Sequence, residues 1–295
     1  MDTTTSSVGQ ASSSSQQACL PAVGDVLAIV RTPRDSAAYV ASRLAARDDG
    51  SVTGCAMTPA FLGARAFRGE ATVMALLESP PTVQRHDDLR TGGDGDAFIR
   101  LAASAGARQP QWTVLGQDPE HDLARLSAWH DLIVVQRPSD EGARPLDGLK
   151  ALLLATHRPC LVLPVTCAPC GVFDRAVLAW DGSGPAARAI RSALPLIVAA
   201  REVVLLDGTR HDRKAEPVVF DPVAFLARHR VSVIHRRMQA TAAEAGAALL
   251  KKARQAKADL LVMGAYGHSP LREQLFGGAT QYVLTHATLA TWLAH

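Results

Sequence analysis

Short runs of apolar residues alternate with amphipathic, Ala- and Leu-rich stretches along most of the chain. Apolar runs of this length, bounded by turn residues, are typical of buried strands, and the amphipathic stretches between them are typical of helices. Strands that alternate with helices imply a parallel sheet with right-handed crossovers. The fold class that follows is α/β, with two Rossmann-like open parallel five-stranded sheets and flanking helices. The predicted strands cover residues 25–31, 52–57, 111–115, 131–136 and 160–163, and then 175–181, 202–207, 231–238, 259–263 and 288–293.

The two halves of the chain repeat the same order of short motifs. VLAIVRTP begins at Val26 and VLAWDGSGP at Val177, while DLIVV at Asp131 corresponds to DLLVM at Asp259. The first pair is 151 residues apart and the second 128, so the first half has 23 extra residues. Pro, Gly and Asp are frequent in residues 80–95, which places the insertion there, in a loop. The sequence therefore predicts a duplicated unit with one insertion.

Changes of composition divide the chain into four parts. Residues 1–22 are rich in Ser, Thr and Gln and are predicted to form a disordered tail. Residues 23–166 form a first domain, 167–174 a linker and 175–295 a second domain. The linker is predicted because PVTCAPCGVFD combines two Pro with a Gly.

Two local signals concern the ends of helices. Thr241 and Glu244 have the spacing of a capping box, which predicts a helix that begins there and ends near Gln255. His157 and His286 each follow a Thr near the end of the last predicted helix of their half. A cation suits a helix C-terminus, so we expect both histidines to have a structural role.

The stretch MGAYGHSPLREQLFGGAT, residues 263–280, is the most informative part of the chain for function. It follows a predicted buried strand, precedes an apolar helix and contains Gly264, Gly267, Gly277 and Gly278. Ligands of open parallel sheets bind beyond the carboxyl ends of strands, where glycine permits close backbone approach and a helix N-terminus offers N–H groups to an anion. The stretch is therefore a candidate phosphate-binding loop.

On these residues the chain resembles the universal stress protein family. The family's ATP-binding members carry Gly, two residues, Gly, nine residues, Gly and then Ser or Thr. Gly264, Gly267 and Gly277 have this spacing, whereas Gly278 occupies the position of the hydroxyl residue. Thr280, two residues further on, is the candidate replacement. The resemblance implies an adenine nucleotide alpha hydrolase-like fold.

A second family signature is an Asp that closes the first strand and lines the nucleoside end of the cleft. Asp181 has this position in the C-terminal half, and Val30 is predicted to occupy it in the N-terminal half. Gln136, Arg137 and Pro138 replace the glycines there, and Pro138 also removes an N–H. The resemblance therefore implies ATP or AMP, with Mg²⁺ as an accompanying ion, in the C-terminal domain, and a degenerate N-terminal domain that binds no nucleotide.

The resemblance also implies how the halves assemble. The last strands of family members pair across a two-fold axis, and residues 161–163 and 291–293 are the candidate edges for such a pairing within one chain. We expect a pseudo-dimer, with further homodimerisation and unidentified protein partners left open.

The residues of the candidate site also have ordinary structural explanations. The glycines are common in turns, and Asp181 is a suitable cap for the following helix, shared with Ser183. His268 and Arg272 fit either a phosphate contact or a solvated surface.

Composition and charge exclude several classes of protein. The net charge of +3 is spread along the chain, which disfavours a nucleic-acid partner, and the apolar runs are too short for a membrane span of about 18 residues. The tail lacks the cationic start and apolar centre of a secretory signal. Cys167 and Cys170 have the spacing of half a zinc site or a redox pair, but a linker is the favoured interpretation. Five sparse cysteines fit a reducing cytoplasm.

The remaining motifs favour a regulatory protein over an enzyme. The sequence has no Walker A motif, and we assign no catalytic residue and no metal site to it. The leading hypothesis is a stress-response protein that binds an adenine nucleotide in its C-terminal domain. The alternatives are an interaction scaffold that binds no nucleotide, or a slow ATPase.

Overall fold

The computed structural model describes residues 22–56, 92–115, 119–138, 146–167, 171–209, 221–265 and 278–295. Its N-terminal half contains β1 (Asp25–Val30), α1 (Ser36–Arg47), β2 (Ser51–Ala56), α4 (Gly92–Ser104), β3 (Arg108–Val114), α5 (Pro119–Ser127), β4 (Leu132–Gln136), α6 (Asp147–Thr156) and β5 (Cys160–Leu163). Its C-terminal half contains β6 (Arg175–Trp180), α7 (Gly184–Ser192), α8 (Leu194–Ala199), β7 (Glu202–Asp207), α9 (Pro222–Arg228), β8 (Ile234–Arg237), α10 (Ala245–Gln255), β9 (Leu260–Gly264), α11 (Gly278–His286) and β10 (Ala290–Ala294).

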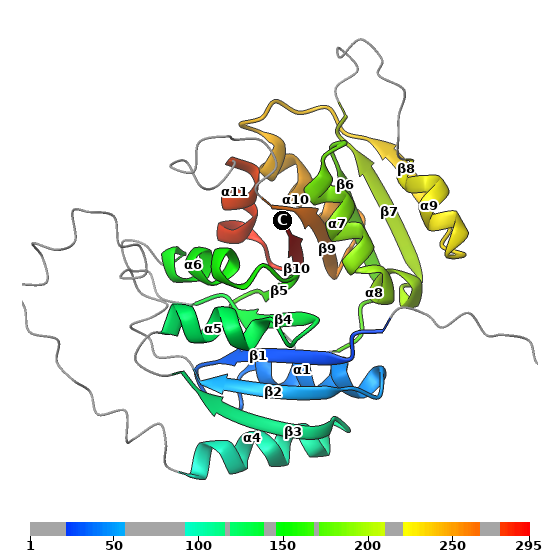
Figure 1. Ribbon diagram of the computed structural model, residues 1–295. Helices are drawn as coiled ribbons and strands as arrows, with labels where there is room; N and C mark the ends of the chain where they lie inside the picture. Colours follow the sequence, from blue (N-terminus) through cyan, green and yellow to red (C-terminus); the bar gives the residue numbers. More distant parts are fainter. Residues whose placement is uncertain are drawn as a thin grey trace, which may run out of the picture.

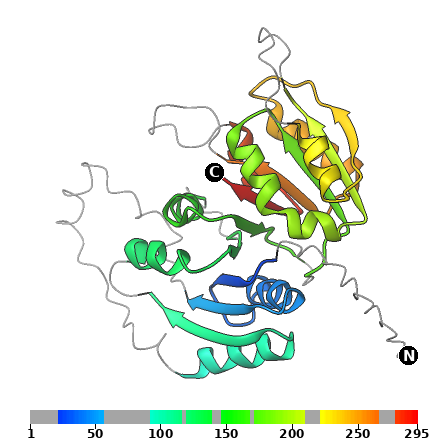
Figure 2. The ribbon, with the colours of Figure 1, turned by 45° about the vertical axis from the view of Figure 1, so that its right-hand side comes forward.

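All the strands belong to one continuous sheet, in the order β3-β2-β1-β4-β5-β10-β9-β6-β7-β8. Each half has the strand order of a doubly wound α/β unit, with every pairing inside a half parallel. The α/β fold predicted from the apolar runs is therefore confirmed, but the two predicted five-stranded sheets are joined into a single ten-stranded sheet. Figures 1 and 2 show the N-terminal half below the C-terminal half, with the C-terminus where the two meet.

The halves join through their last strands, which pair antiparallel. Thr291 is opposite Val162, Trp292 opposite Leu161 and Leu293 opposite Cys160. The expected pairing of the two last strands is confirmed, with residues 160–162, rather than 161–163, opposite 291–293. The side chains of Trp292 and Leu161 are both fully buried, so the core continues from one half into the other.

Side chains alternate between the two faces of the sheet, as the pleat of a strand requires. One apolar cluster contains Val26 and Ala28 of β1 and is covered by α1, α4, α7, α8 and α9. The other contains Leu27 and Ile29 and is covered by α5, α6, α10 and α11. Both clusters include residues of both halves, because the sheet is continuous.

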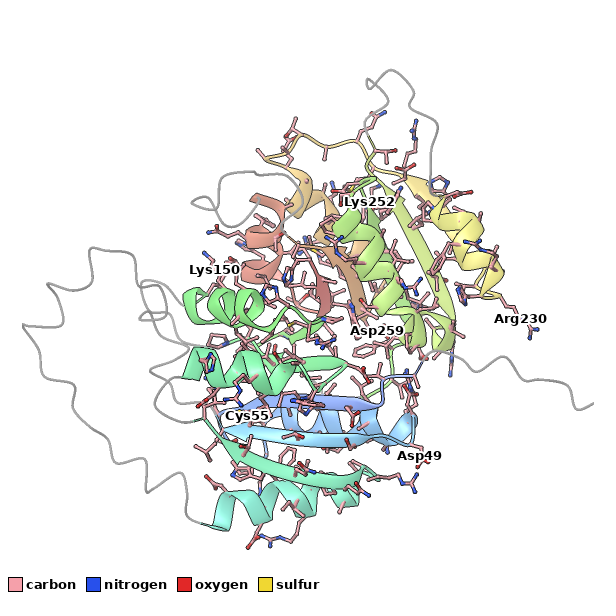
Figure 3. The ribbon with its side chains drawn as sticks, viewed as in Figure 1. Asp49, Cys55, Lys150, Arg230, Lys252 and Asp259 are labelled. Atoms are coloured by element: carbon pink, nitrogen blue, oxygen red, sulfur yellow. The ribbon has the colours of Figure 1, made fainter. Side chains whose placement is uncertain are left out.

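A repeated aspartate aligns the two halves more accurately than the apolar pattern does. Asp131 Oδ2 accepts hydrogen bonds from the N–H groups of Gly24 (3.0 Å) and Asp25 (3.1 Å). Asp259 accepts from the N–H of Asp174 through Oδ2 (2.8 Å) and from the N–H of Arg175 through Oδ1 (3.0 Å), and Figure 3 labels it just before β9.

The hydrogen bonds of Asp131 and Asp259, called the aspartate clamp below, show which residues of the two halves are equivalent. They place β1 and β6 150 residues apart in the sequence, not 151. Asp25 therefore corresponds to Arg175, and Arg31, not Val30, corresponds to Asp181. The prediction for Val30 was wrong because a run of apolar residues does not fix its own register. Strand pairing makes Ala56 at the end of β2 equivalent to Asp207, an offset of 151 residues. It makes Val114 at the end of β3 equivalent to Arg237, an offset of 123 residues, so the N-terminal half has 28 extra residues between β2 and β3. This interval contains residues 80–95, of which 80–91 lie outside the described part.

Two predictions about helix ends need correction. The Thr241 N–H donates to Glu244 Oε2 at 3.4 Å, but α10 begins after Glu244 without a side-chain cap, so only half of the capping box forms. His157 and His286 do not occupy matching positions, because the strand register aligns Cys160 with Thr291. His157 is the left-handed cap of α6 at φ 49°, whereas His286 lies inside the last turn of α11 and bonds the carbonyl of Tyr282 at 2.9 Å.

Candidate functional site

The turn after β6 presents Asp181 at the carboxyl edge of the sheet. Asp181 is exposed, and its Oδ1 accepts a hydrogen bond from the N–H of Ser183 at 2.9 Å. Gly182 has φ +82°, a conformation that favours glycine. Ser183 caps α7 by accepting from the N–H of Ala186 at 3.2 Å. The cap is therefore Ser183, while Asp181 holds the turn through its Oδ1.

Gly264 ends β9 directly against the beginning of α7. A Cβ at this position would lie 2.5 Å from Ala186 N, 2.7 Å from Pro185 C and 2.9 Å from Pro185 Cβ, distances that real side chains do not occupy. Glycine is therefore required here for close packing between strand and helix, as in dinucleotide-binding folds. The same contact brings the start of the glycine-rich stretch beside the turn of Asp181.

The remaining candidate residues are placed unequally. Gly267 and Gly277 lie outside the described residues, as do His268 and Arg272. Gly278 is the first residue of α11, and a Cβ there would meet nothing within 4 Å. Thr280 is only 5% exposed, so its hydroxyl lies in the interior of the domain. The position after the glycine motif is therefore open, while the proposed replacement hydroxyl is buried.

The neighbouring strand contributes a polar cluster that sequence reasoning missed. Asp207 ends β7 opposite Trp180. Its Oδ1 accepts from the N–H of Thr209 at 2.9 Å and from the hydroxyl at 2.6 Å, and its Oδ2 lies 3.3 Å from His235 Nε2. Burial acts to raise the pKa of Asp207, but these bonds outweigh it and the pKa is lowered. The signal was present as Asp-Gly-Thr after a predicted strand.

The N-terminal half has different side chains at the equivalent edge. Arg31 stands where Asp181 stands, and Gln136 stands where Gly264 stands. Gln136 Nε2 donates to the carbonyl of Val165 at 2.8 Å. A cation and an amide thus replace the carboxylate and the glycine of the other half.

Arg137 connects this edge to the C-terminal half. Its guanidinium donates to the carbonyls of Leu284 (2.9 Å) and Ala287 (3.1 Å), which are left unpaired where α11 ends. A cation at this end also complements the helix dipole. Burial lowers the pKa of Arg137. The N-terminal half therefore supports the helix that follows the glycine-rich stretch.

The described parts of the chain give limited further information on other classes of site. Cys55 and Cys160 are free thiols, and burial raises the pKa of each to about 12. Cys170 lies outside the described residues. Within these residues no group of three or more His, Cys, Asp or Glu side chains is placed to hold a metal ion. No helix among them is long and apolar enough to cross a membrane.

The architecture defines an α/β protein with a candidate ligand edge in its C-terminal half, and comparisons with known proteins identify the family of that half. Residues 173–295 match the model of the Universal stress protein family. Over these residues the chain is therefore similar to the universal stress protein family. No curated protein sequence matches the chain.

Solved structures extend the similarity of fold to nearly the whole chain. A universal stress protein from Archaeoglobus fulgidus DSM 4304 has a TM-score of 0.61 and 15% identity, covering 92% of this chain and 95% of that chain. A putative universal stress protein from Pseudomonas aeruginosa UCBPP-PA14 has a TM-score of 0.58 and 15% identity, covering 92% and 93%. At this identity the likeness establishes the fold of both halves.

Proposed function

We propose that the C-terminal domain binds an adenine nucleotide, ATP or AMP, and that the protein is a regulatory component of a stress response. The observation that carries the proposal is the contact of Gly264 with the start of α7. It sets a carboxylate, a helix N-terminus and the beginning of a glycine-rich stretch at one edge of a parallel sheet, where such folds bind nucleotides. The domain's family supports the same assignment.

In the proposed complex Asp181 accepts hydrogen bonds from the nucleoside, and main-chain N–H groups near Gly267, Gly277 and Gly278 bind the phosphates. Thr280 is buried, so the site has lost the hydroxyl at the end of the motif. The described residues offer no ready metal cluster, so we expect any Mg²⁺ to be held mainly by phosphate oxygens and water.

Isothermal titration with ATP and AMP tests this proposal. Asp181→Asn preserves the hydrogen bond to Ser183 but removes the negative charge. Losing a charge-assisted hydrogen bond to the nucleoside should lower nucleotide affinity about tenfold. Asp49→Asn is the matched control, because Asp49 is an exposed aspartate at a distant corner of the N-terminal half (Figure 3). Folded protein that binds neither nucleotide at millimolar concentration refutes the proposal.

The regulatory assignment is tested separately. We expect phosphate release from ATP to stay at the level of the protein-free reaction. Steady release that disappears in Asp181→Asn identifies a slow ATPase instead.

We further propose that the chain is a tandem protein whose N-terminal half is a degenerate copy that binds no nucleotide. The shared strand order and the repeated aspartate clamp support the duplication. Arg31 and Gln136 at the equivalent edge support the loss of the site. The free thiols support a reducing, cytoplasmic location as part of this proposal.

An interaction scaffold is the second candidate function. Trp129 is 83% exposed in the turn before β4, and exposed tryptophans are frequent at protein interfaces. In that case Trp129→Ala abolishes partner capture, while Asp181→Asn leaves it unchanged.

A further inference from the structure

Arg137 directly follows β4 and connects the two halves through its side chain. Its N–H donates to the carbonyl of Leu163 at 2.9 Å, which fixes its main chain to β5 of the same half. Its guanidinium crosses to the other half and donates to the carbonyls of Leu284 (2.9 Å) and Ala287 (3.1 Å). Leu284 and Ala287 are 2% and 5% exposed, so water has little access to replace these contacts.

The antiparallel pairing of β5 with β10 explains why this side chain reaches α11. It places the carboxyl edge of the N-terminal half on the same side as the amino edge of the C-terminal half. Because α11 precedes β10, it ends at that amino edge and begins at the opposite, carboxyl edge of its own half. Figures 1 and 2 show α11 on the side of its half that faces the N-terminal half. Arg137 therefore contacts the end of α11 that lies away from the proposed nucleotide site.

The beginning of α11 is held sideways by a close contact with α10. A Cβ at Gly246 would lie 2.9 Å from Ala279 O and 2.7 Å from Tyr282 Cβ, so the two helices touch at their first turns. This contact sets the distance between the helices. The last carbonyls of a helix point along its axis, so the bonds from Arg137 restrain α11 in that direction. A helix of nine residues is a rod of about 13 Å, and a shift at its end therefore also moves Gly278 at its start.

The equivalent position in the C-terminal half cannot make such a contact. Arg137 corresponds to Ala265, whose N–H donates to the carbonyl of Ala294 at the end of β10 at 2.8 Å. Alanine has no side-chain donor, and the end of α6 receives a bond from its own half, from Ser127 Oγ to the carbonyl of Thr156 at 3.3 Å. This bridge therefore runs in one direction, toward the helix that follows the glycine-rich stretch.

We propose that Arg137 is a positioning residue for the proposed nucleotide site, which it serves by holding α11 so that the N–H groups of its first turn meet the phosphates. This inference rests on the proposed function. Asp181, the proposed nucleoside contact, is held by its own turn before α7, so Arg137 acts on the phosphate contacts alone. By linkage, bound phosphate strengthens the contact between α11 and Arg137, and the N-terminal half takes part in sensing the nucleotide.

Isothermal titration of the full chain with ATP and with adenosine tests the proposal. In Arg137→Met the affinity for ATP should fall about tenfold, as for one lost hydrogen bond to a charged phosphate, while the affinity for adenosine stays unchanged. Arg137→Lys keeps a cationic donor and should lose less. A merely structural role would change the affinities for both ligands alike, or neither.

Arg158→Met is the matched control. Arg158 is likewise a half-buried arginine of the N-terminal half, and its Nη2 donates to a main-chain carbonyl, that of Ala128 at 2.6 Å, within its own half. We expect this variant to bind ATP like the unsubstituted protein. Equal losses of ATP affinity in Arg158→Met and Arg137→Met overturn the proposal, as do equal losses for ATP and adenosine in Arg137→Met. Circular dichroism checks folding, and if Arg137→Met does not fold, Arg137→Lys must show the selective loss for ATP.

Hydrogen exchange of the full chain provides a second readout. ATP should slow exchange both in α11 and at the end of β4 in the unsubstituted protein, whereas in Arg137→Met the protection should be confined to the C-terminal half. Protection at the end of β4 that persists in Arg137→Met contradicts the route through Arg137.

The nucleotide function and the role of Arg137 fail in different ways. Folded, unsubstituted protein that binds neither ATP nor AMP refutes the nucleotide function, and the role of Arg137 with it. Unsubstituted protein that binds ATP, together with the same ATP affinity in Arg137→Met, overturns only the role of Arg137.

Discussion

Gly264→Ala introduces one methyl group at the tightest contact of the candidate site. The new Cβ would lie 2.5 Å from Ala186 N and 2.7 Å from Pro185 C, both backbone atoms that cannot rotate away. Ordinary contacts begin at about 3.4 Å, so the start of α7 must move by roughly 1 Å from the end of β9. Overpacking of this kind costs about 1–3 kcal/mol.

Gly278→Ala is the control for this substitution. A Cβ at Gly278 meets nothing within 4 Å, and Gly278 does not have a positive φ. Alanine there should be neutral or stabilising by up to about 1 kcal/mol, because it restricts the unfolded chain. Urea unfolding monitored by circular dichroism compares the two variants with the unsubstituted protein.

The reasoning about Gly264 also predicts a change in ligand binding. Displacing α7 separates the turn of Asp181 from the end of β9, so nucleotide affinity should fall in Gly264→Ala and stay unchanged in Gly278→Ala. Equal unfolding free energies of the two variants would refute the packing argument. Reduced stability with unchanged nucleotide affinity would refute the link from packing to the site.

Three further predictions concern other parts of the site. Gly278→Ser restores a hydroxyl at an open position and should strengthen ATP binding about tenfold in isothermal titration; no gain contradicts the assignment of that position. Arg137→Met removes two hydrogen bonds to the end of α11 and should destabilise the protein by about 1–3 kcal/mol, with faster hydrogen exchange in α11; Arg137→Lys should recover part of the loss. Because the pKa of Asp207 is lowered in the folded protein, its carboxylate contributes stability at pH values above its pKa in the unfolded chain, about 3.9, and this stability is lost as the pH falls through the folded pKa. Asp207→Asn should therefore flatten the decline of the unfolding free energy between pH 5 and 2. An unchanged slope contradicts the role of the hydrogen bonds to Asp207.

Much of the fold could be predicted from sequence because its strands are buried on both faces. Residues 160–163 and 203–206 are continuous apolar segments, and the observed β5 and β7 have the bounds predicted from them, 160–163 and 202–207. The prediction was least accurate for the two edge strands: β3 is Arg108–Val114 where 111–115 was predicted, and β8 is Ile234–Arg237 where 231–238 was predicted. All four residues of β8 are exposed. An edge strand lacks the burial that makes a strand recognisable.

The relation between the halves was harder to predict because it depends on contacts between distant residues. Two apolar runs align equally well at an offset of 150 or 151, and only the hydrogen bonds of Asp131 and Asp259 select the first. The role of Arg137 depends on α11, which lies about 150 residues away in the chain.

Some parts of the candidate site could likewise be predicted from local sequence, and others depend on contacts between distant residues. The turn of Asp181 and the position of Gly264 follow from local patterns after strands, and the structure places both at one edge. The close contact that makes Gly264 necessary depends on where α7 begins, which a glycine spacing does not show. The cluster of Asp207 and His235 required knowledge of strand adjacency.

The pairing of β5 with β10 has a consequence for exchange of partners between chains. Both strands belong to one polypeptide, so each meets the other at an effective concentration on the order of millimolar. A separate protein that presents a matching strand edge competes only when its own concentration approaches that value. The covalent link between the two halves therefore favours pairing within one chain, and among the described strands it leaves β3 and β8 as the outer edges of the sheet.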